Sequence, residues 1–139
     1  VGASSEVELK EKQDRVEDAM CATKAAIKEG IVPGGGIALL NASTYVKPSN
    51  DNEKVLLEAI KAPYLTILKN AGLEEVYPKG KGKGINVVTG KDVNMIKSGI
   101  IDPLLVTKSA LKNAASVATT ILSTDCVINN LRVEDESNR

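Results

Sequence analysis

The first thirty residues carry apolar side chains at the spacing of one helix face. The apolar stripe consists of Val16, Met20, Thr23 and Ile27. Intervals of three and four residues place these side chains on one side of an α-helix. Ser4 or Ser5 can cap its start, and Gly30 is typical of a left-handed C-cap. The pattern therefore predicts a helix over residues 6–29, about 35 Å long at a rise of about 1.5 Å per residue.

Charged side chains along this helix are arranged in pairs. Glu6 precedes Lys10, and Glu8 precedes Lys12, by four residues. This is the favourable order for ion pairs on a helix surface. We expect both pairs on the exposed side of the helix.

Three consecutive glycines, Gly34 to Gly36, separate this helix from the next apolar segment. Glycine inside a helix costs roughly 0.5–1 kcal/mol relative to alanine, so the run marks a bend or a close approach. It allows three roles: a hinge, a helix start whose free N–H groups meet a ligand, or close packing. A second helix is expected from the glycines through residues 37–40 toward Tyr45.

The middle of the chain predicts a loop followed by a divided helix. Residues 47–52 are rich in turn-forming side chains and indicate a surface loop. Apolar positions from Val55 onward predict a third helix that continues to about Gly72. Pro63 lies inside this pattern and is expected to kink or split it.

Helical periodicity is lost between residues 74 and 99. Residues 79–84 alternate Lys and Gly and predict a flexible basic loop, and residues 85–90 predict a short strand closed by a turn. Asp102 and Pro103 match the N-cap and the first position of a helix. They are expected to open a long, alanine-rich helix.

Composition narrows the class of protein. The 139 residues are 42% apolar and 26% charged, which is ordinary for a globular protein. Phe and Trp are absent and three Tyr occur, so we expect a core of Ala, Val, Ile and Leu. A net charge of zero and few aromatic residues give no reason to expect binding to nucleic acid. No apolar run approaches the roughly 20 residues of a membrane span. The chain lacks an initiator Met, and we interpret it as a piece of a longer protein.

The two cysteines are not expected to form a site. Cys21 lies in a helical pattern, and Cys126 lies in a strand-like run at residues 126–128. Each is expected to be a small buried apolar side chain. The chain has no histidine and no cysteine pair at metal-ligand spacing, so we expect neither a disulfide nor a metal site.

Two carboxylates are candidates for chemistry. Asp18 follows Val16 by two residues, which turns it about 200° around the helix and away from the apolar stripe. Such a carboxylate is most simply a solvated surface group, but it can orient or deprotonate water if a phosphoryl group reaches it. Asp102 is most simply an N-cap, although its second oxygen could accept hydrogen bonds from a ribose. Neither GxxxxGK[ST] nor a supported GxGxxG is present.

Separate motifs recur along the whole chain in a fixed order. They are Val1-Gly2-Ala3 with Glu6-Val7-Glu8, RVEDA at 15–19, the glycine run, Asn86, Asn94-Met95-Ile96, and residues 99–103, 106–111 and 114–118. In this order and spacing they resemble the region joining the intermediate and equatorial domains of the group I chaperonins of bacteria and organelles. The resemblance covers essentially the whole chain.

The resemblance implies roles for particular residues. Asp18 matches the aspartate that activates water for ATP hydrolysis once the intermediate domain closes over the nucleotide. Gly35 matches a backbone position that lines the nucleotide site, and Asp102 matches the acid that binds the ribose hydroxyls. The segment beside the adenine is Asn86, Val87 and Val88. The implied cofactor is ATP with Mg²⁺ and K⁺, whose ligands lie outside this chain.

The resemblance also implies the architecture. The expected fold class is mainly α: a multihelical half of an equatorial domain, with a short antiparallel β element and a protruding intermediate-domain helix. Residues 1–33 would be the C-terminal segment of the intermediate domain, and residues 34–139 the C-terminal half of the equatorial domain. Residues 30–36 would then form the hinge that swings the helix bearing Asp18.

The implied parent protein is an ATP-driven folding machine of two stacked seven-subunit rings. Its partners would be other chaperonin subunits, a co-chaperonin, and unfolded clients bound through an apical domain outside this chain. Neither nucleic acid nor a membrane is an expected partner. The expected location is the bacterial cytoplasm, or the matrix of mitochondria or plastids. The phosphate-binding loop belongs to the other half of the family's nucleotide site, so the isolated chain is expected to be inactive.

Two departures from the family leave alternatives open. Residues 74–85 form a segment several residues shorter than in the family, and Val87 and Val88 are bulkier than the small residues common there. One alternative is a non-enzymatic helical interaction module derived from a chaperonin. Another is a nucleic-acid binder that uses the lysines between Lys79 and Lys97. The joint presence of the matched site residues favours the ATP-dependent interpretation.

Overall fold

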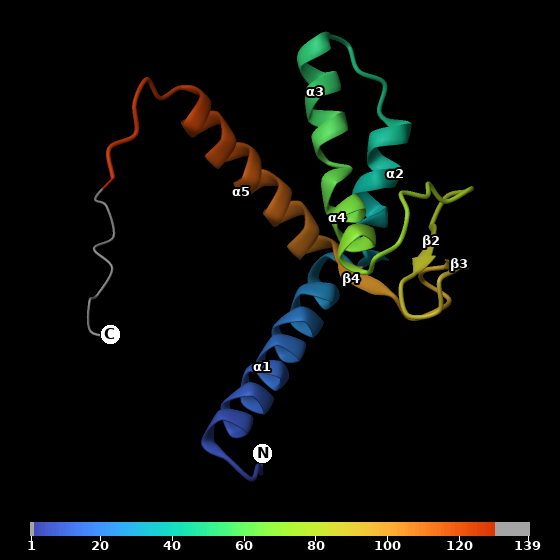
Figure 1. The fold of residues 1–139 in the computed structure, drawn as a ribbon, viewed down its shortest axis with the longest axis vertical. Coiled ribbons are helices and arrows are strands. Elements are labelled where there is room, and N and C mark those ends of the chain that lie inside the picture. The colour runs from blue at the N-terminus through green and yellow to red at the C-terminus, as the bar shows by residue number, and fades with distance from the viewer. Residues whose placement is uncertain (1, 130–139) are drawn as a thin grey trace.

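The computed structural model describes residues 2–129, which contain five helices and four short strands. The helices are α1 (Glu6–Glu29), α2 (Ile37–Tyr45), α3 (Asp51–Ala59), α4 (Ala62–Asn70) and α5 (Leu104–Leu122). The strands are β1 (Ile31–Pro33), β2 (Lys83–Asn86), β3 (Lys91–Asn94) and β4 (Ile101–Pro103). Figure 1 shows α1 and α5 extending in different directions from a body that contains the other elements. The mainly helical fold class is confirmed; the end of the expected 34–139 unit, residues 130–139, lies outside the described residues.

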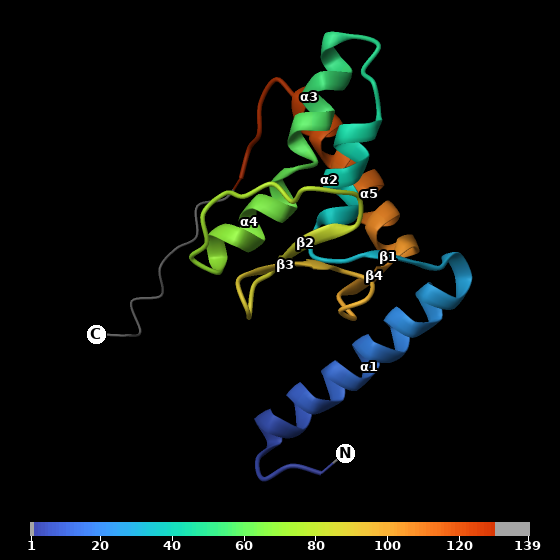
Figure 2. The ribbon, with the colours of Figure 1, turned by 90° about the vertical axis from the view of Figure 1, so that its right-hand side faces the viewer.

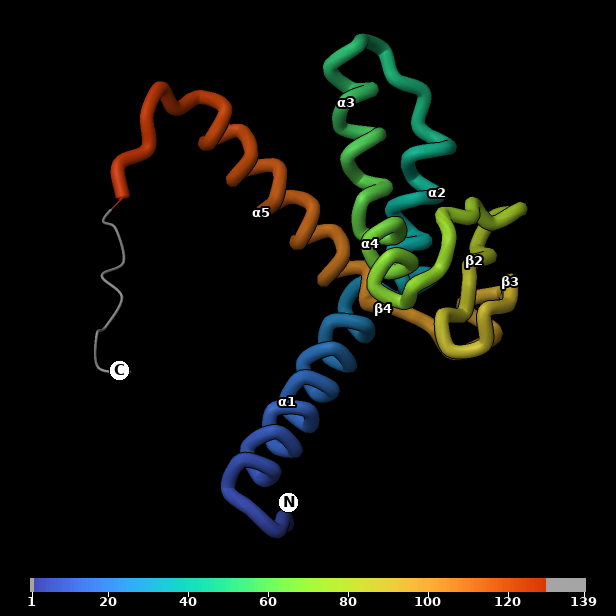
Figure 3. The backbone as a smooth tube through the Cα atoms, viewed as in Figure 1, coloured from blue at the N-terminus to red at the C-terminus, as the bar shows by residue number. Residues whose placement is uncertain are grey.

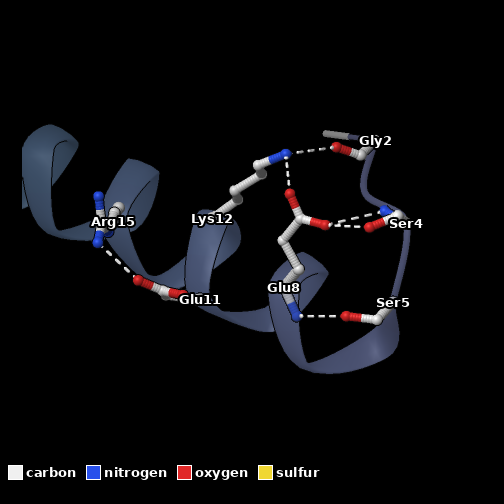
Figure 4. Close-up of polar contacts among 7 residues, drawn as sticks. All are labelled: Gly2, Ser4, Ser5, Glu8, Glu11, Lys12 and Arg15. Carbon is white, nitrogen blue, oxygen red and sulfur yellow. Dashed lines mark hydrogen bonds and ion pairs between the residues drawn. The ribbon is translucent and has the colours of Figure 1, made fainter.

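Hydrogen bonds among side chains of the first turn fix the start of α1 (Figure 4). Ser5 is the N-cap, and its Oγ accepts a hydrogen bond from the Glu8 N–H at 3.2 Å. The Glu8 carboxylate accepts bonds from the Ser4 N–H and hydroxyl, and it pairs with Lys12 at 2.7 Å. These bonds, the one from Lys12 above all, lower the pKa of Glu8 to about 2. The predicted cap and the predicted Glu8–Lys12 pair are confirmed.

The second predicted pair on α1 is wrong. Glu6 and Lys10 do not pair within the part of the chain that the structure describes. Instead, Arg15 pairs with Glu11 at 2.6 Å, one turn beyond the Glu8–Lys12 pair. α1 therefore carries one ion pair where it was predicted and a second pair, Glu11–Arg15, in place of the predicted Glu6–Lys10.

The apolar stripe of α1 is exposed. Val16 is 50% exposed, Met20 53% and Ile27 80%, whereas Ala25 is the one buried side chain of the helix. Figure 2 shows the N-terminal turns of α1 leading away from the other elements. The predicted stripe exists as a pattern, but the described residues do not cover it.

Gly30 ends α1 and leads directly into a strand. Its φ of 85° and ψ of −170° form a combination that glycine adopts readily. It is not the left-handed C-cap that we expected, because its ψ is extended. The following strand, β1, pairs antiparallel with β4 and places Val32 opposite Asp102. The Leu104 N–H also donates to the Gly30 carbonyl at 3.1 Å, which ties the start of α5 to the end of α1.

Asp102 is not the N-cap of the last helix. It lies within β4, and Pro103 occupies the N-cap position without a side-chain hydrogen bond. The helix begins one residue later than predicted, because pairing with β1 keeps the backbone at Asp102 extended. Asp102 is half-buried, and its side chain is not used to cap α5.

The hydrophobic core lies where α2, α4 and the segment after β3 meet. Its buried members are Ile37, Leu40, Tyr64, Leu68 and Met95. The Tyr64 side chain is 2% exposed, and its hydroxyl donates to the Val76 carbonyl at 2.7 Å. Burial raises the pKa of Tyr64, and the charges of Asp92 and Tyr77 add to this effect. The expectation of a core without aromatic residues is wrong, because Tyr64 is its largest member.

Gly36 lets the start of α2 pack directly against α4. Its φ is 78°, and a Cβ at this position would lie 2.7 Å from the Tyr64 backbone nitrogen. A side chain would therefore force the two helices apart. Gly34, at the other end of the run, donates its N–H to the Ile100 carbonyl at 3.0 Å. Close packing is thus one role of the glycine run.

The loop after α2 and the division of the third helix agree with the prediction. α3 ends at Ala59 and α4 begins at Ala62, with Pro63 in its first turn. Asn50 caps α3, because its Oδ1 accepts a hydrogen bond from the Glu53 N–H at 2.8 Å. The loop consequently ends two residues earlier than expected.

The predicted strand at residues 85–90 is displaced. β2 covers Lys83–Asn86 and pairs antiparallel with β3, while residues 87–90 form the turn between the two strands. In the basic segment at 79–84, residues 79–82 form a turn and residues 83–84 begin β2. The segment is therefore not a loop over its whole length. The hairpin turn therefore begins immediately after Asn86.

α5 leaves the body in a different direction from α2, α3 and α4 (Figure 3) and has no buried side chain. An apolar groove of about 310 Å³ lies between α5 and these helices, with Ile60 and Pro63 on one side and Leu111 and Ala114 on the other. None of the helices in residues 2–129 is long and apolar enough to cross a membrane.

The expectations for the two cysteines and the last strand are wrong. Cys21 and Cys126 are both exposed, and residues 126–128 have no regular secondary structure. Cys21 is exposed because most of α1 projects from the body. Cys126 lies beyond the end of α5, where the residues described are also exposed.

Candidate functional site

Four residues that the sequence analysis assigns to a ligand meet at one pocket. The pocket has a volume of about 300 Å³ and lies between α4, β2 and the glycine run. The predicted residues on its wall are Gly35, Asn86, Val87 and Val88. We call it the α4–β2 pocket. Folding brings the glycine run and the turn between β2 and β3 together, although α2, α3 and α4 lie between them in the sequence.

The other walls of the α4–β2 pocket are mainly apolar. They are formed by Tyr64, Ile67, Leu68, Ile85, Met95 and Ile100. Sequence reasoning missed these residues, because apolar side chains at helical spacing in α4 predict a core. Tyr64, Leu68 and Met95 do belong to the core, so the same residues support the fold and form the wall. A volume of this size lies at the lower end of the range for small-molecule sites.

Gly35 exposes its backbone directly to the pocket. Its φ is 64°, and a Cβ here would lie 3.2 Å from the Met95 Cε. Any larger residue would adopt a strained backbone and would push against Met95. The position therefore suits a close approach of backbone to ligand.

Asn86 organises the turn at the mouth of the pocket. Its Oδ1 accepts hydrogen bonds from the Val88 N–H at 3.0 Å and the Thr89 N–H at 3.4 Å. Its carbonyl accepts a bond from the Gly90 N–H at 2.7 Å. These bonds make an Asx turn, in which the side chain imitates a backbone acceptor. The Asn86 side chain is therefore held in one orientation beside the pocket.

Val87 and Val88 form the outer edge of this turn. Val87 is 41% exposed and Val88 is 90% exposed. Both line the pocket, so their bulk lies at its rim and not in its interior. The larger side chains noted in the sequence are thus mainly solvent-exposed, whereas Tyr64, Leu68 and Met95 on the same wall are buried.

Asp102 lies near the pocket but not on its wall. It is two residues from Ile100, which does line the pocket and whose carbonyl accepts the hydrogen bond from Gly34. Because β4 pairs with β1, Asp102 lies beside the strand that leads into the glycine run. The structure therefore places Asp102 on β4, two residues after Ile100, and outside the residues that line the pocket.

Asp18 lies on the exposed surface of α1 and not at the α4–β2 pocket. It precedes Gly30 by twelve residues, which is about 18 Å along the helix axis at about 1.5 Å per residue. Its neighbours in a shallow surface hollow all belong to α1: Glu11, Asp14, Arg15, Glu17 and Cys21. The apolar stripe lines a different hollow, so Asp18 faces away from the stripe as its spacing predicts.

The chemistry of the pocket wall suits a mainly apolar, uncharged group. None of the wall residues carries a charge, and within residues 2–129 no group of three or more His, Cys, Asp or Glu could hold a metal ion. The polar side chains on the wall are Tyr64 and Asn86, and the Tyr64 hydroxyl is already bonded to Val76. An uncharged, mainly apolar wall suits an apolar or heteroaromatic ring better than an anionic group.

Comparisons with known proteins give one consistent result. A model of the TCP-1/cpn60 chaperonin family matches residues 1–132. A crystal structure of a group III chaperonin in the open state is similar to this chain, with a TM-score of 0.78 and 28% sequence identity. The match covers 92% of this chain and 30% of the group III chaperonin chain. The present chain therefore spans about a third of the length of that protein.

Proposed function

This chain belongs to the TCP-1/cpn60 chaperonin family, and we propose that it supplies the base- and ribose-facing side of an ATP site in a protein-folding machine. The observation that carries this proposal is the meeting of Gly35, Asn86, Val87 and Val88 in one pocket. Its apolar walls and its single available amide suit an adenine ring. Chaperonins are ATPases, which makes ATP the ligand to expect.

Asp102 is proposed to accept hydrogen bonds from the ribose hydroxyls. Two observations support this role: the side chain is half-buried beside β1, and it is not used as a helix cap. A ribose at Asp102 would place the attached base toward Ile100 and the α4–β2 pocket. The sugar and the base would then occupy adjoining parts of one site.

Asp18 is proposed to act after α1 rotates about Gly30. The carboxylate would then reach the terminal phosphate, orient the attacking water and accept its proton as the water oxygen bonds to phosphorus. The bond from that phosphorus to the bridging oxygen would break at the same time, and ADP would leave with the electron pair. Gly30 supports a pivot, because α1 ends there in a backbone conformation, φ 85° and ψ −170°, that glycine adopts readily. The paired strands β1 and β4 give the pivot a fixed base. Mg²⁺ and K⁺, held by ligands outside this chain, would neutralise the negative charge of the phosphates.

The division of the chain into domains follows from the same proposal. Residues 1–33 would belong to the intermediate domain, in which α1 is the part that moves, and residues 34–139 would belong to the equatorial domain. The motif resemblance to group I chaperonins supports assignment to that group. Two exposed apolar surfaces, on α1 and on α5, fit packing against further parts of such a subunit.

The wider biology of a group I chaperonin is proposed with it. The parent protein would assemble with other subunits into a double ring, bind a co-chaperonin and fold clients captured by an apical domain. It would act in the bacterial cytoplasm or in an organelle matrix. The present chain would contribute hydrolysis, hinge and base-recognition residues, and it would have no ATPase activity alone.

Replacement of Asp18 tests the proposed function. In the longer polypeptide, Asp18→Ala should leave ATP binding intact and slow hydrolysis by a factor on the order of 10² to 10⁴. Asp14 is a matched control, because it lies one turn earlier in the same surface hollow; Asp14→Ala should leave hydrolysis within about twofold. Robust ATP turnover by the 139-residue chain alone would contradict the proposal. Failure of the longer polypeptide to bind ATP would favour the non-enzymatic interaction module.

A further inference from the structure

We propose that a second, smaller pocket, between the end of α2 and residues 77–81, binds a small aromatic carboxylate. Its volume is about 160 Å³, and its wall includes Tyr45, Tyr77 and Lys81. We call it the Tyr45 pocket. It shares no lining residue with the α4–β2 pocket, so the inference is independent of the proposed ATP site.

Aromatic and apolar side chains from two parts of the chain meet in the Tyr45 pocket. Tyr45 is the last residue of α2, and Tyr77 and Pro78 belong to the segment between α4 and β2. The Tyr45 and Tyr77 side chains are 62% and 51% exposed, so much of each ring is open to a ligand. Tyrosine rings pair with other rings in stacked or edge-to-face arrangements. The wall therefore suits an aromatic ring.

Lys81 gives the Tyr45 pocket a single positive charge. Its Nζ lies 5.3 Å from the centroid of the Tyr45 ring, within the distance at which an ammonium group is attracted to an aromatic face. No carboxylate lies on the pocket wall, and Lys81 forms no ion pair within residues 2–129. An ammonium group has three N–H donors and no acceptor. The charged group that it can bind is therefore an anion.

The size and the charge of the Tyr45 pocket limit the ligand. A volume of about 160 Å³ is roughly half that of the α4–β2 pocket, and it lies below the range of about 300–1,000 Å³ typical of drug-sized ligands. One ammonium group balances one negative charge, whereas a phosphate group carries about 1.5 to 2 at pH 7. A monoanion with one small ring therefore fits better than a phosphate. An aromatic carboxylate is such a ligand.

The neighbouring lysines separate position from charge. Lys79 and Lys83 belong to the same alternating Lys–Gly segment as Lys81, but they lie outside the wall of the Tyr45 pocket. Any of the three can attract an anion through the solvent. Lys81 alone among them lies on the same wall as the tyrosine rings, so a ligand with both a ring and a charge should depend on Lys81.

Titration of the ¹⁵N-labelled 139-residue chain with benzoate at constant ionic strength tests the proposal. We expect shifts at the amides of Asn41, Tyr45, Gly80 and Lys81. Benzyl alcohol keeps the ring without the charge, and it should bind about three- to tenfold more weakly, because Lys81 is exposed and its attraction for the carboxylate is partly screened. Acetate keeps the charge without the ring. It should bind about two- to tenfold more weakly, because it lacks the contacts with the tyrosine rings.

Two variants provide a matched comparison. Lys81→Gln and Lys79→Gln each remove one positive charge from the same Lys–Gly segment, but Lys79 does not line the pocket. Lys81→Gln should bind benzoate no more tightly than benzyl alcohol. Lys79→Gln should keep the preference for benzoate. Both side chains are exposed, so neither change should disturb the fold, and the comparison on the unaltered chain decides the matter if either does.

Several results would overturn the proposal. One is equal binding of benzoate and benzyl alcohol by the unaltered chain, or no shift at millimolar benzoate. Another is an equal loss in Lys79→Gln and Lys81→Gln, or an equal response to inorganic phosphate, because either would show a diffuse attraction of anions to the lysines. These results leave the proposed ATP site untouched, since Gly35 and residues 86–88 line the other pocket.

Discussion

Glu29 and Lys108 form an ion pair of 2.6 Å that joins the last turn of α1 to α5. The other four ion pairs among the described residues connect positions three or four apart in the sequence. This pair alone bridges elements distant in sequence, and it lies near the bond from the Leu104 N–H to Gly30. The Glu29–Lys108 pair therefore helps to fix the angle between α1 and α5 at the proposed pivot.

Breaking this pair should loosen the orientation of α1 more than it lowers stability. The Lys108 side chain is 60% exposed, and exposed pairs contribute about 0–1 kcal/mol. Lys108→Met should accordingly lower the free energy of unfolding by less than about 1 kcal/mol. Spin labels on Cys21 and at position 112, in a Lys112→Cys and Cys126→Ser background, should report a broader distance distribution. Glu11→Gln, which breaks a pair within α1, should leave that distribution unchanged.

Gly36→Ala should destabilise the fold more than an alanine at another left-handed glycine. Gly36 and Gly72 have φ values of 78° and 69°, but a Cβ at Gly36 would lie 2.7 Å from the Tyr64 nitrogen, whereas one at Gly72 meets no atom within 4 Å. Gly72→Ala should cost about 1–2 kcal/mol, the ordinary cost of left-handed backbone. Gly36→Ala should cost more, because α2 and α4 must also separate. Urea unfolding of both variants measures the difference; equal losses would show that the close approach is unimportant.

Tyr64→Phe should lower the free energy of unfolding by about 1 kcal/mol, because the Val76 carbonyl loses its partner. Tyr77→Phe is the control: Tyr77 is 51% exposed, and the change should be within about 0.5 kcal/mol. The raised pKa of Tyr64 adds a pH signature. Its neutral hydroxyl stabilises the fold below the ordinary tyrosine pKa of about 10, and this contribution is lost as the pH rises through the higher folded value. Thermal unfolding of Tyr64→Phe should lack this alkaline component.

The first turn of α1 should fray in acid. The pKa of Glu8 is lowered from 4.5 to about 2 in the folded chain, chiefly by its bond from Lys12. The ionised carboxylate therefore stabilises the turn above pH 4.5, and this contribution is lost as the pH falls from 4.5 to about 2. Amide shifts of Ser4 and Ser5 should follow this titration. Glu8→Gln should remove it; an unchanged acid profile in that variant would rule out Glu8 as the cause.

The positions of the helices could be predicted from the sequence, but the segments that pack or pair with one another could not. The Ser5 cap and the break at Pro63 depend on neighbouring residues, so sequence spacing located them. Asp102 was misplaced because β4 pairs with β1, residues about seventy positions away. Cys21 was expected to be buried because a helical pattern does not reveal which helix projects from the body. Both of these errors came from a contact, or from a lack of one, between distant segments.

The candidate site was predictable through resemblance and not through local pattern. Gly35 and Asn86 carry no signal of a shared pocket in their own surroundings, yet they meet in one. Ile67 and Met95 on the same wall could not be separated from core residues by spacing. The hydrogen bond from the Val88 N–H to the Asn86 side chain depends on the hairpin turn after β2. The sequence pattern predicted this turn a few residues away from its position in the structure.

The most direct test of the account is to map where ATP contacts this chain. In a titration of the ¹⁵N-labelled protein with Mg²⁺–ATP, we predict that amide shifts concentrate at Gly35, residues 86–88 and Ile100, with no change at Asp18. Shifts confined to the lysine-bearing segment at 79–84, with the pocket amides unmoved, would contradict the account, because they would show phosphate attraction without a base site.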